Sequence, residues 1–93
     1  SSTAQFYAIR DLNEAKAYIS HPVLGARLLE ISRALTQLPC SDPTSVMGYP
    51  DDLKLCSCMT LFELVSDDPV FAEVLDKFYG GRRDTRTLRL LGL

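Results

Sequence analysis

The residues best suited to chemistry lie in two places, and the first is a basic stretch near the C-terminus. Thirteen residues hold five cations there, Lys77, Arg82, Arg83, Arg86 and Arg89. Guanidinium groups match phosphate oxygens bidentately, so Arg82 and Arg83 could hold a small anion such as a nucleotide phosphate. The alternative is a solvated helix end whose cations offset the acidic stretch before it. The pattern favours this alternative and leaves the ligand role open.

The second place is an aspartate pair at the start of a helix that we expect over about residues 51–65. Carboxylates at a helix N-terminus are stabilised by the helix dipole, so one aspartate is expected to serve as the cap. The few polar residues on this otherwise apolar segment include Asp52, Lys54, Ser57 and Thr60. Polar groups on a buried helix must be hydrogen-bonded or line a cavity. We favour internal hydrogen bonds and keep ligand binding as the alternative.

His21, the single histidine, stands just before Pro22 at the joint between two expected helices. A lone histidine can act as a general base, but the sequence identifies no serine or cysteine nucleophile that His21 would activate. We therefore expect His21 to cap a helix. No glycine-rich phosphate loop or dinucleotide fingerprint occurs, so we expect no cofactor.

The three cysteines are Cys40, Cys56 and Cys58, an odd number that suits no closed set of disulfides. A zinc site would need all of them to converge with His21 without any recognised spacing. We therefore expect no metal and instead reduced, buried thiols that behave as small hydrophobes. Reduced thiols are typical of a cytoplasmic protein.

Composition narrows the class of protein. The chain has 93 residues, of which 46% are hydrophobic and 24% charged, enough for a single small domain over residues 1–93. The net charge of −2 gives no basic excess to neutralise phosphates, so we expect no nucleic-acid binding. No apolar run approaches the roughly 18 residues of a membrane span, so we expect no membrane insertion.

Apolar spacing, caps and prolines predict an all-α domain of four to five helices. The clearest periodic stripe consists of Leu24, Leu28, Ile31, Leu35 and Leu38. Further helices are expected over about 11–20, around 71–78 and after Asp84, with a single turn near 44–47. The segment 51–65 is apolar nearly all round, which is typical of the buried centre of a helical bundle.

Three stretches of sequence carry a resemblance to a known family. They are "HPVLGARL" at residues 21–28, "PDDLKL" at 50–55 and "SCMTLF" at 57–62. Together they make the chain, from about Phe6 to Leu91, similar to the bacterial and fungal family known as domain of unknown function 1810. The resemblance implies a compact all-helical protein and brings no established activity with it.

The family pattern usually has a further N-terminal portion ahead of the point where this chain begins. The chain starts at Ser1, so we expect it to be the C-terminal part of a longer family domain. Without that portion, Leu53, Leu61 and Leu64 would be exposed on the central helix. Contiguous apolar patches are uncommon on monomers. We therefore expect a homodimer, or a second polypeptide that supplies the missing elements.

The function predicted from these observations is a non-catalytic binding or interaction module. No set of nucleophile, base and oxyanion donor can be identified in the chain. The alternative is binding of an ADP-ribose-type nucleotide or hydrolysis of its N-glycosidic bond. It rests on the spacing of Lys54, Met59, Leu61 and Phe78, which resembles that of helical domains with this activity. In that case Lys54 with Arg82 or Arg83 would hold phosphate, and Asp52 would stabilise oxocarbenium charge.

Overall fold

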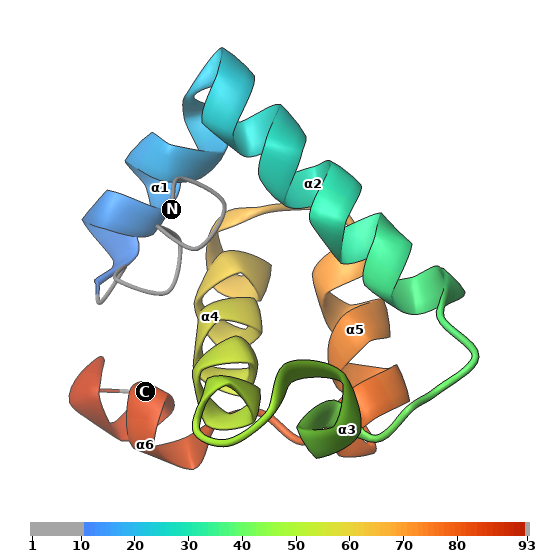
Figure 1. Ribbon diagram of the computed structural model, residues 1–93. Helices are drawn as coiled ribbons and strands as arrows, with labels where there is room; N and C mark the ends of the chain where they lie inside the picture. The colour runs from blue at the N-terminus through green and yellow to red at the C-terminus, as the bar shows by residue number, and fades with distance from the viewer. Residues whose placement is uncertain (1–10, 93) are drawn as a thin grey trace.

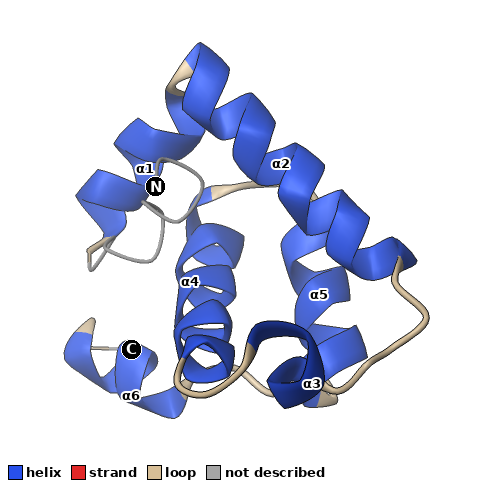
Figure 2. Ribbon diagram, viewed as in Figure 1, coloured by secondary structure: helices blue, strands red, loops and turns tan. Residues whose placement is uncertain are grey.

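Residues 11–92 are described by a computed structural model, and every regular element in that range is a helix (Figures 1 and 2). The helices are α1 (Leu12–Ser20), α2 (Pro22–Gln37), α3 (Pro43–Met47), α4 (Asp51–Val65), α5 (Val70–Tyr79) and α6 (Thr85–Leu90). The predicted all-α class is confirmed. The described range holds six helices rather than four to five because the single turn expected near 44–47 is itself a short helix, α3.

Side-chain caps define several helix starts, as the sequence predicts. The Asp11 carboxylate accepts from the Glu14 amide at 2.8 Å at the start of α1. His21 Nδ1 accepts from the amides of Val23 and Leu24, both at 3.1 Å, so His21 is the expected helix cap. The prediction of an aspartate cap on α4 is wrong. Its cap position is Pro50, whose side chain has no atom that can accept a hydrogen bond. Both aspartates lie within the first turn.

Helix α4 lies at the centre of the bundle, which confirms the prediction for residues 51–65. It packs against α1, α3, α5 and α6, while α2 packs against α1 and α5 (Figure 1). Leu61 was expected to be exposed, and this is wrong, since it is 1% exposed. Helices cover α4 on several sides, and the leucines that remain exposed on it are Leu53 and Leu64. Their exposed fractions are 57% and 44%.

The connection from α5 to α6 is fixed at both ends. Gly80 ends α5 in the left-handed conformation at φ 61°, and the Gly81 amide donates to the Leu75 carbonyl at 3.1 Å. At the other end, the Asp84 amide donates to the hydroxyl of buried Thr60 on α4 at 3.0 Å. The chain between these anchors is therefore held against α4, which places residues 82 and 83 in a defined loop.

No helix in the described range is both long enough and apolar enough to cross a membrane.

Candidate functional site

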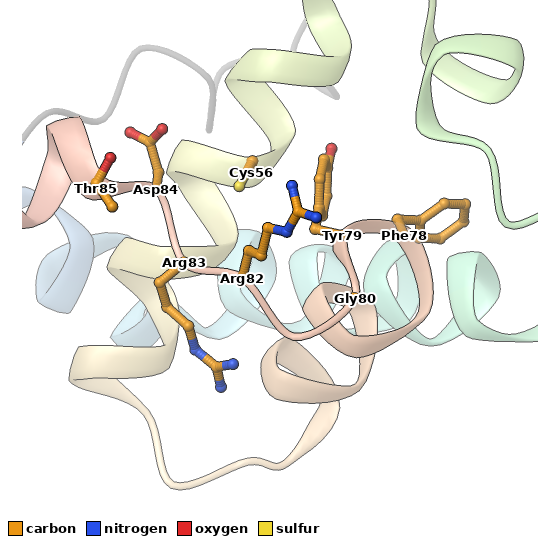
Figure 3. Close-up of a pocket in the computed structure, with 8 residues that line it drawn as sticks. All are labelled: Cys56, Phe78, Tyr79, Gly80, Arg82, Arg83, Asp84 and Thr85. Atoms are coloured by element: carbon orange, nitrogen blue, oxygen red, sulfur yellow. The ribbon is translucent and has the colours of Figure 1, made fainter.

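A pocket of about 740 Å³ lies where the end of α5 and the loop to α6 meet α4 (Figure 3). We call it the α5–α6 pocket. Its lining residues are Cys56, Phe78, Tyr79, Gly80, Arg82, Arg83, Asp84 and Thr85. Its volume falls within the roughly 300–1,000 Å³ typical of sites for small organic ligands. It brings together both arginines that the sequence singled out.

Arg83 is held by the protein itself. Its Nε donates to Glu63 Oε1 at 2.8 Å and its Nη2 bonds the other carboxylate oxygen, so the pair is bidentate. The hydrogen bonds that Arg83 donates to Glu63 raise the pKa of Arg83 above its ordinary value. In Figure 3 the Arg83 side chain turns away from Cys56. Arg83 therefore joins the loop to α4. This fits the alternative in which the cations of the basic stretch offset acidic residues of the chain.

Arg82 is the available cation of the α5–α6 pocket. Its side chain is exposed, and within the described part of the chain its guanidinium makes no hydrogen bond or ion pair. Figure 3 shows it extending toward the side of the pocket where Cys56 and Tyr79 lie. A guanidinium with all its donors open can take a carboxylate or phosphate bidentately.

Cys56 is a thiol that lines the pocket without being reactive. Burial, together with a smaller effect of the nearby Asp84 carboxylate, raises its pKa to about 11. Since the thiolate is the nucleophilic form, Cys56 remains a neutral thiol near pH 7. Burial likewise raises the pKa of Cys58 to about 12. The expectation of buried thiols is wrong for Cys40, which is exposed in the loop between α2 and α3.

The remaining walls of the α5–α6 pocket are fixed by hydrogen bonds and burial. The Tyr79 hydroxyl donates to the Asp52 carbonyl, and Phe78 is 6% exposed, so these rings form a rigid apolar side. Asp84 caps α6, where its Oδ2 accepts from the Thr87 amide at 3.0 Å and from the Thr87 hydroxyl. The pocket thus offers one open cation, one carboxylate and an apolar wall.

A second pocket of about 530 Å³ lies between α4 and α6, and we call it the α4–α6 groove. It is lined by Leu53, Lys54, Ser57, Asp84, Arg86, Thr87 and Leu90. Lys54 lies 3.9 Å from the Asp51 carboxylate, and both side chains are about half exposed. The Ser57 and Thr87 hydroxyls are bonded to each other at 2.7 Å. Lys54 and Ser57 are therefore separated from Arg82 and Arg83.

The other residues singled out by the sequence lie away from both pockets. Asp52 is 8% exposed, and its carboxylate accepts from the Thr44 hydroxyl at 2.7 Å and from the Leu53 amide at 2.9 Å. Thr60 is fully buried and donates to the Cys56 carbonyl at 2.8 Å. His21 lies at the α1–α2 corner. The internal hydrogen bonds expected for polar groups of the central helix are present at both Asp52 and Thr60.

Sequence reasoning missed most of the residues that complete the α5–α6 pocket. Asp84 stood out only as the residue before the last helix, Cys56 as a buried thiol and Tyr79 not at all. A usable signal was present in the sequence, because Gly80-Gly81 marks a turn that is followed within three residues by two arginines and an aspartate.

Within residues 11–92, no three His, Cys, Asp or Glu side chains gather so as to hold a metal ion.

Two of three comparisons with known proteins find a match for the chain. A family model described as "Protein of unknown function (DUF1810)" matches residues 1–91. A comparison with curated proteins finds no match. The chain is 44% identical to the conserved hypothetical protein Rv1873 from Mycobacterium tuberculosis, whose crystal structure it matches with a TM-score of 0.84. The match covers 89% of this chain and 60% of that one, so this chain corresponds to part of the longer protein. The chain belongs to the DUF1810 family of proteins of unknown function.

Proposed function

We propose that this domain is a non-catalytic binding module that holds a small organic anion in the α5–α6 pocket. The observation that carries the proposal is the contrast between two neighbouring arginines. Arg83 is neutralised by Glu63, whereas the Arg82 guanidinium faces the pocket with no partner in the described range. We expect its three cysteines to stay reduced, which suits a protein that works in the reducing cytoplasm.

The placement of the other candidate residues supports binding over hydrolysis. Hydrolysis of an N-glycosidic bond would need Asp52 beside the ligand, but its carboxylate is engaged by Thr44 and lines neither pocket. Lys54, the proposed phosphate partner, lines the α4–α6 groove instead. Cys56, the thiol within the α5–α6 pocket, is protonated. A nucleotide remains a suitable ligand for Arg82, without a reaction.

Arg82→Ala is the variant that tests this proposal. Isothermal titration calorimetry with AMP and ADP-ribose should detect binding to the native chain and a loss of about tenfold or more in affinity for the variant, because a charge-assisted hydrogen bond contributes roughly 1.5–3 kcal/mol. Arg89→Ala is the matched control, since Arg89 is an exposed cation of α6 that lines neither pocket. Equal affinities for the native chain and Arg82→Ala would overturn the proposal.

We also propose that the domain pairs with a second copy through the α4–α6 groove. Leu53 and Leu90 are 57% and 79% exposed and line the same groove. Burying apolar surface gains roughly 25 cal/mol per Å². The groove is lined by charges of both signs, Lys54, Arg86 and Asp84, so a second copy related by a two-fold axis can bring opposite charges together.

Sedimentation equilibrium tests this pairing. The native chain should form a dimer at high micromolar concentration, and the double variant Leu53→Ser/Leu90→Ser should be monomeric. High salt should weaken the dimer, since the charges at the groove are solvent-exposed. A native chain that remains monomeric at this concentration would contradict the proposal. It would leave a different polypeptide as the partner.

A further inference from the structure

The α5–α6 pocket contains charges of both signs that are not paired with each other. Arg82 and Asp84 both line it, and no ion pair joins them. Asp84 uses its Oδ2 for the Thr87 amide and hydroxyl, while its Oδ1 has no hydrogen-bond partner in the described range. Figure 3 shows the two side chains leaving the same loop on either side of Cys56. Both groups line one pocket, so a ligand would have to span it to reach the cationic fork and the carboxylate oxygen together.

This combination of charges selects among anions. A carboxylate repels a bare phosphate held nearby, because like charges disfavour each other in a partly desolvated site. An ionised carboxylate is a pure acceptor and needs hydroxyl or amine donors. Acidic side chains accept hydrogen bonds from ribose hydroxyls in this way in dinucleotide-binding proteins. A ligand that satisfies both groups must therefore have an anionic end for Arg82 and a donor-rich part for Asp84.

We infer that the α5–α6 pocket takes a phosphorylated sugar, such as the ribose phosphate portion of a nucleotide. Its phosphate would bind Arg82, and its hydroxyls would donate to Asp84. This inference rests on the proposed function and adds the class of ligand. A volume of about 740 Å³ is far larger than an inorganic anion needs, and the Phe78 and Tyr79 rings give the pocket an apolar wall suited to an organic body.

Asp84→Asn separates the role of the carboxylate from its role as a cap. Asparagine is as good an N-cap as aspartate, so the start of α6 should be retained while the charge is removed. Calorimetric titrations would use ribose 5-phosphate and inorganic phosphate. We expect Asp84→Asn to bind ribose 5-phosphate about five- to tenfold more weakly, because with the amide oxygen kept at the cap the group facing the ligand is an NH2, which cannot accept from the sugar hydroxyls. It should bind inorganic phosphate as well as the native chain, or more tightly, since a repulsive charge is gone.

Two further variants make the result interpretable. Arg82→Ala should lower the affinity for both compounds. Asp42→Asn changes the cap of α3, which lines neither pocket, and should change neither affinity. Circular dichroism of each variant would show whether the helices are retained.

The outcomes distinguish the inference from the proposed function. Suppose that Arg82→Ala lowers the affinity for both compounds but Asp84→Asn changes the two affinities equally. The sugar assignment is then overturned and anion binding stands. O-phosphoethanolamine, a phosphate with an ammonium group, is the third probe. If it binds more tightly than ribose 5-phosphate, and if Asp84→Asn lowers the affinity for it alone, the ligand is an amine and the sugar assignment is wrong. If no probe binds the native chain, the proposed function itself fails.

Discussion

Phe62→Ala should destabilise the domain by about 3–5 kcal/mol, the usual cost of truncating a buried phenylalanine. Phe62 is fully buried on α4, with its ring centroid 5.9 Å from that of Tyr18 on α1 and 5.6 Å from that of Phe71 on α5. Its loss would therefore leave a cavity where three helices meet. Domains of this size have total stabilities of roughly 5–15 kcal/mol, so the variant should be partly unfolded at 37 °C.

Chemical denaturation followed by circular dichroism measures this effect. Leu64→Ala is the matched control, because Leu64 lies on the same helix but is 44% exposed. The control should lose about 1 kcal/mol or less. A similar small loss for Phe62→Ala would contradict the central position of α4. Ligand binding in the α5–α6 pocket should be lost together with the core, since α4 supplies both Cys56 and the Thr60 hydroxyl that anchors the loop.

Gly25→Ala should have the second largest effect, although alanine is the better helix former. Gly25 lies at the α1–α2 corner, where a Cβ atom would stand 2.1 Å from the Ile19 carbonyl oxygen and 2.9 Å from its carbon. These are backbone atoms, so α1 would have to move away from α2. Overpacking of this kind costs roughly 1–3 kcal/mol, and a backbone clash belongs at the upper end. The gain of about 1 kcal/mol in helix propensity offsets part of this loss.

Thermal and chemical denaturation of Gly25→Ala would be compared with those of Ala26→Ser. Ala26 is the next residue of α2 and is exposed, so this substitution adds one atom without a clash. It should change stability by about 0.5 kcal/mol or less. An unchanged or raised stability of Gly25→Ala would show that α1 and α2 do not approach each other as closely as described.

The helices were predictable because their signals are local. Pro22 and His21 mark the start of α2. Of the predicted stripe of leucine and isoleucine, Leu28 and Leu35 are buried, whereas Leu38 follows the helix and is exposed. The same logic identified α4 as central, since an apolar surface all round needs neighbours all round. It could not say which of its leucines are covered. Leu61 and Leu64 were expected to be equally exposed, yet Leu61 is buried and Leu64 is exposed, because the positions of the packed helices decide this.

The candidate site was harder to predict because it depends on contacts between distant residues. Arg82 and Arg83 are chemically identical neighbours, and nothing local distinguishes them. Glu63, which neutralises Arg83, is 20 positions earlier in the chain. Likewise Asp84 is identifiable as a cap from its place before a helix, but its presence in the same pocket as Arg82 follows from the Thr60 anchor on α4. Tertiary structure therefore determines which charges are available.

Chemical-shift mapping tests the central claim most directly, because it shows where a ligand binds without assuming which residue matters. The ¹H–¹⁵N spectrum of the native chain would be recorded during titration with ribose 5-phosphate. We expect the shifted signals to belong to residues 78–85, to Cys56 and to the Arg82 Nε–H, and to saturate with one affinity. Signals of α1 and α2 should not move. Shifts centred on the α1–α2 corner, or no shifts in the 78–85 segment at saturating ligand, would contradict binding in the α5–α6 pocket.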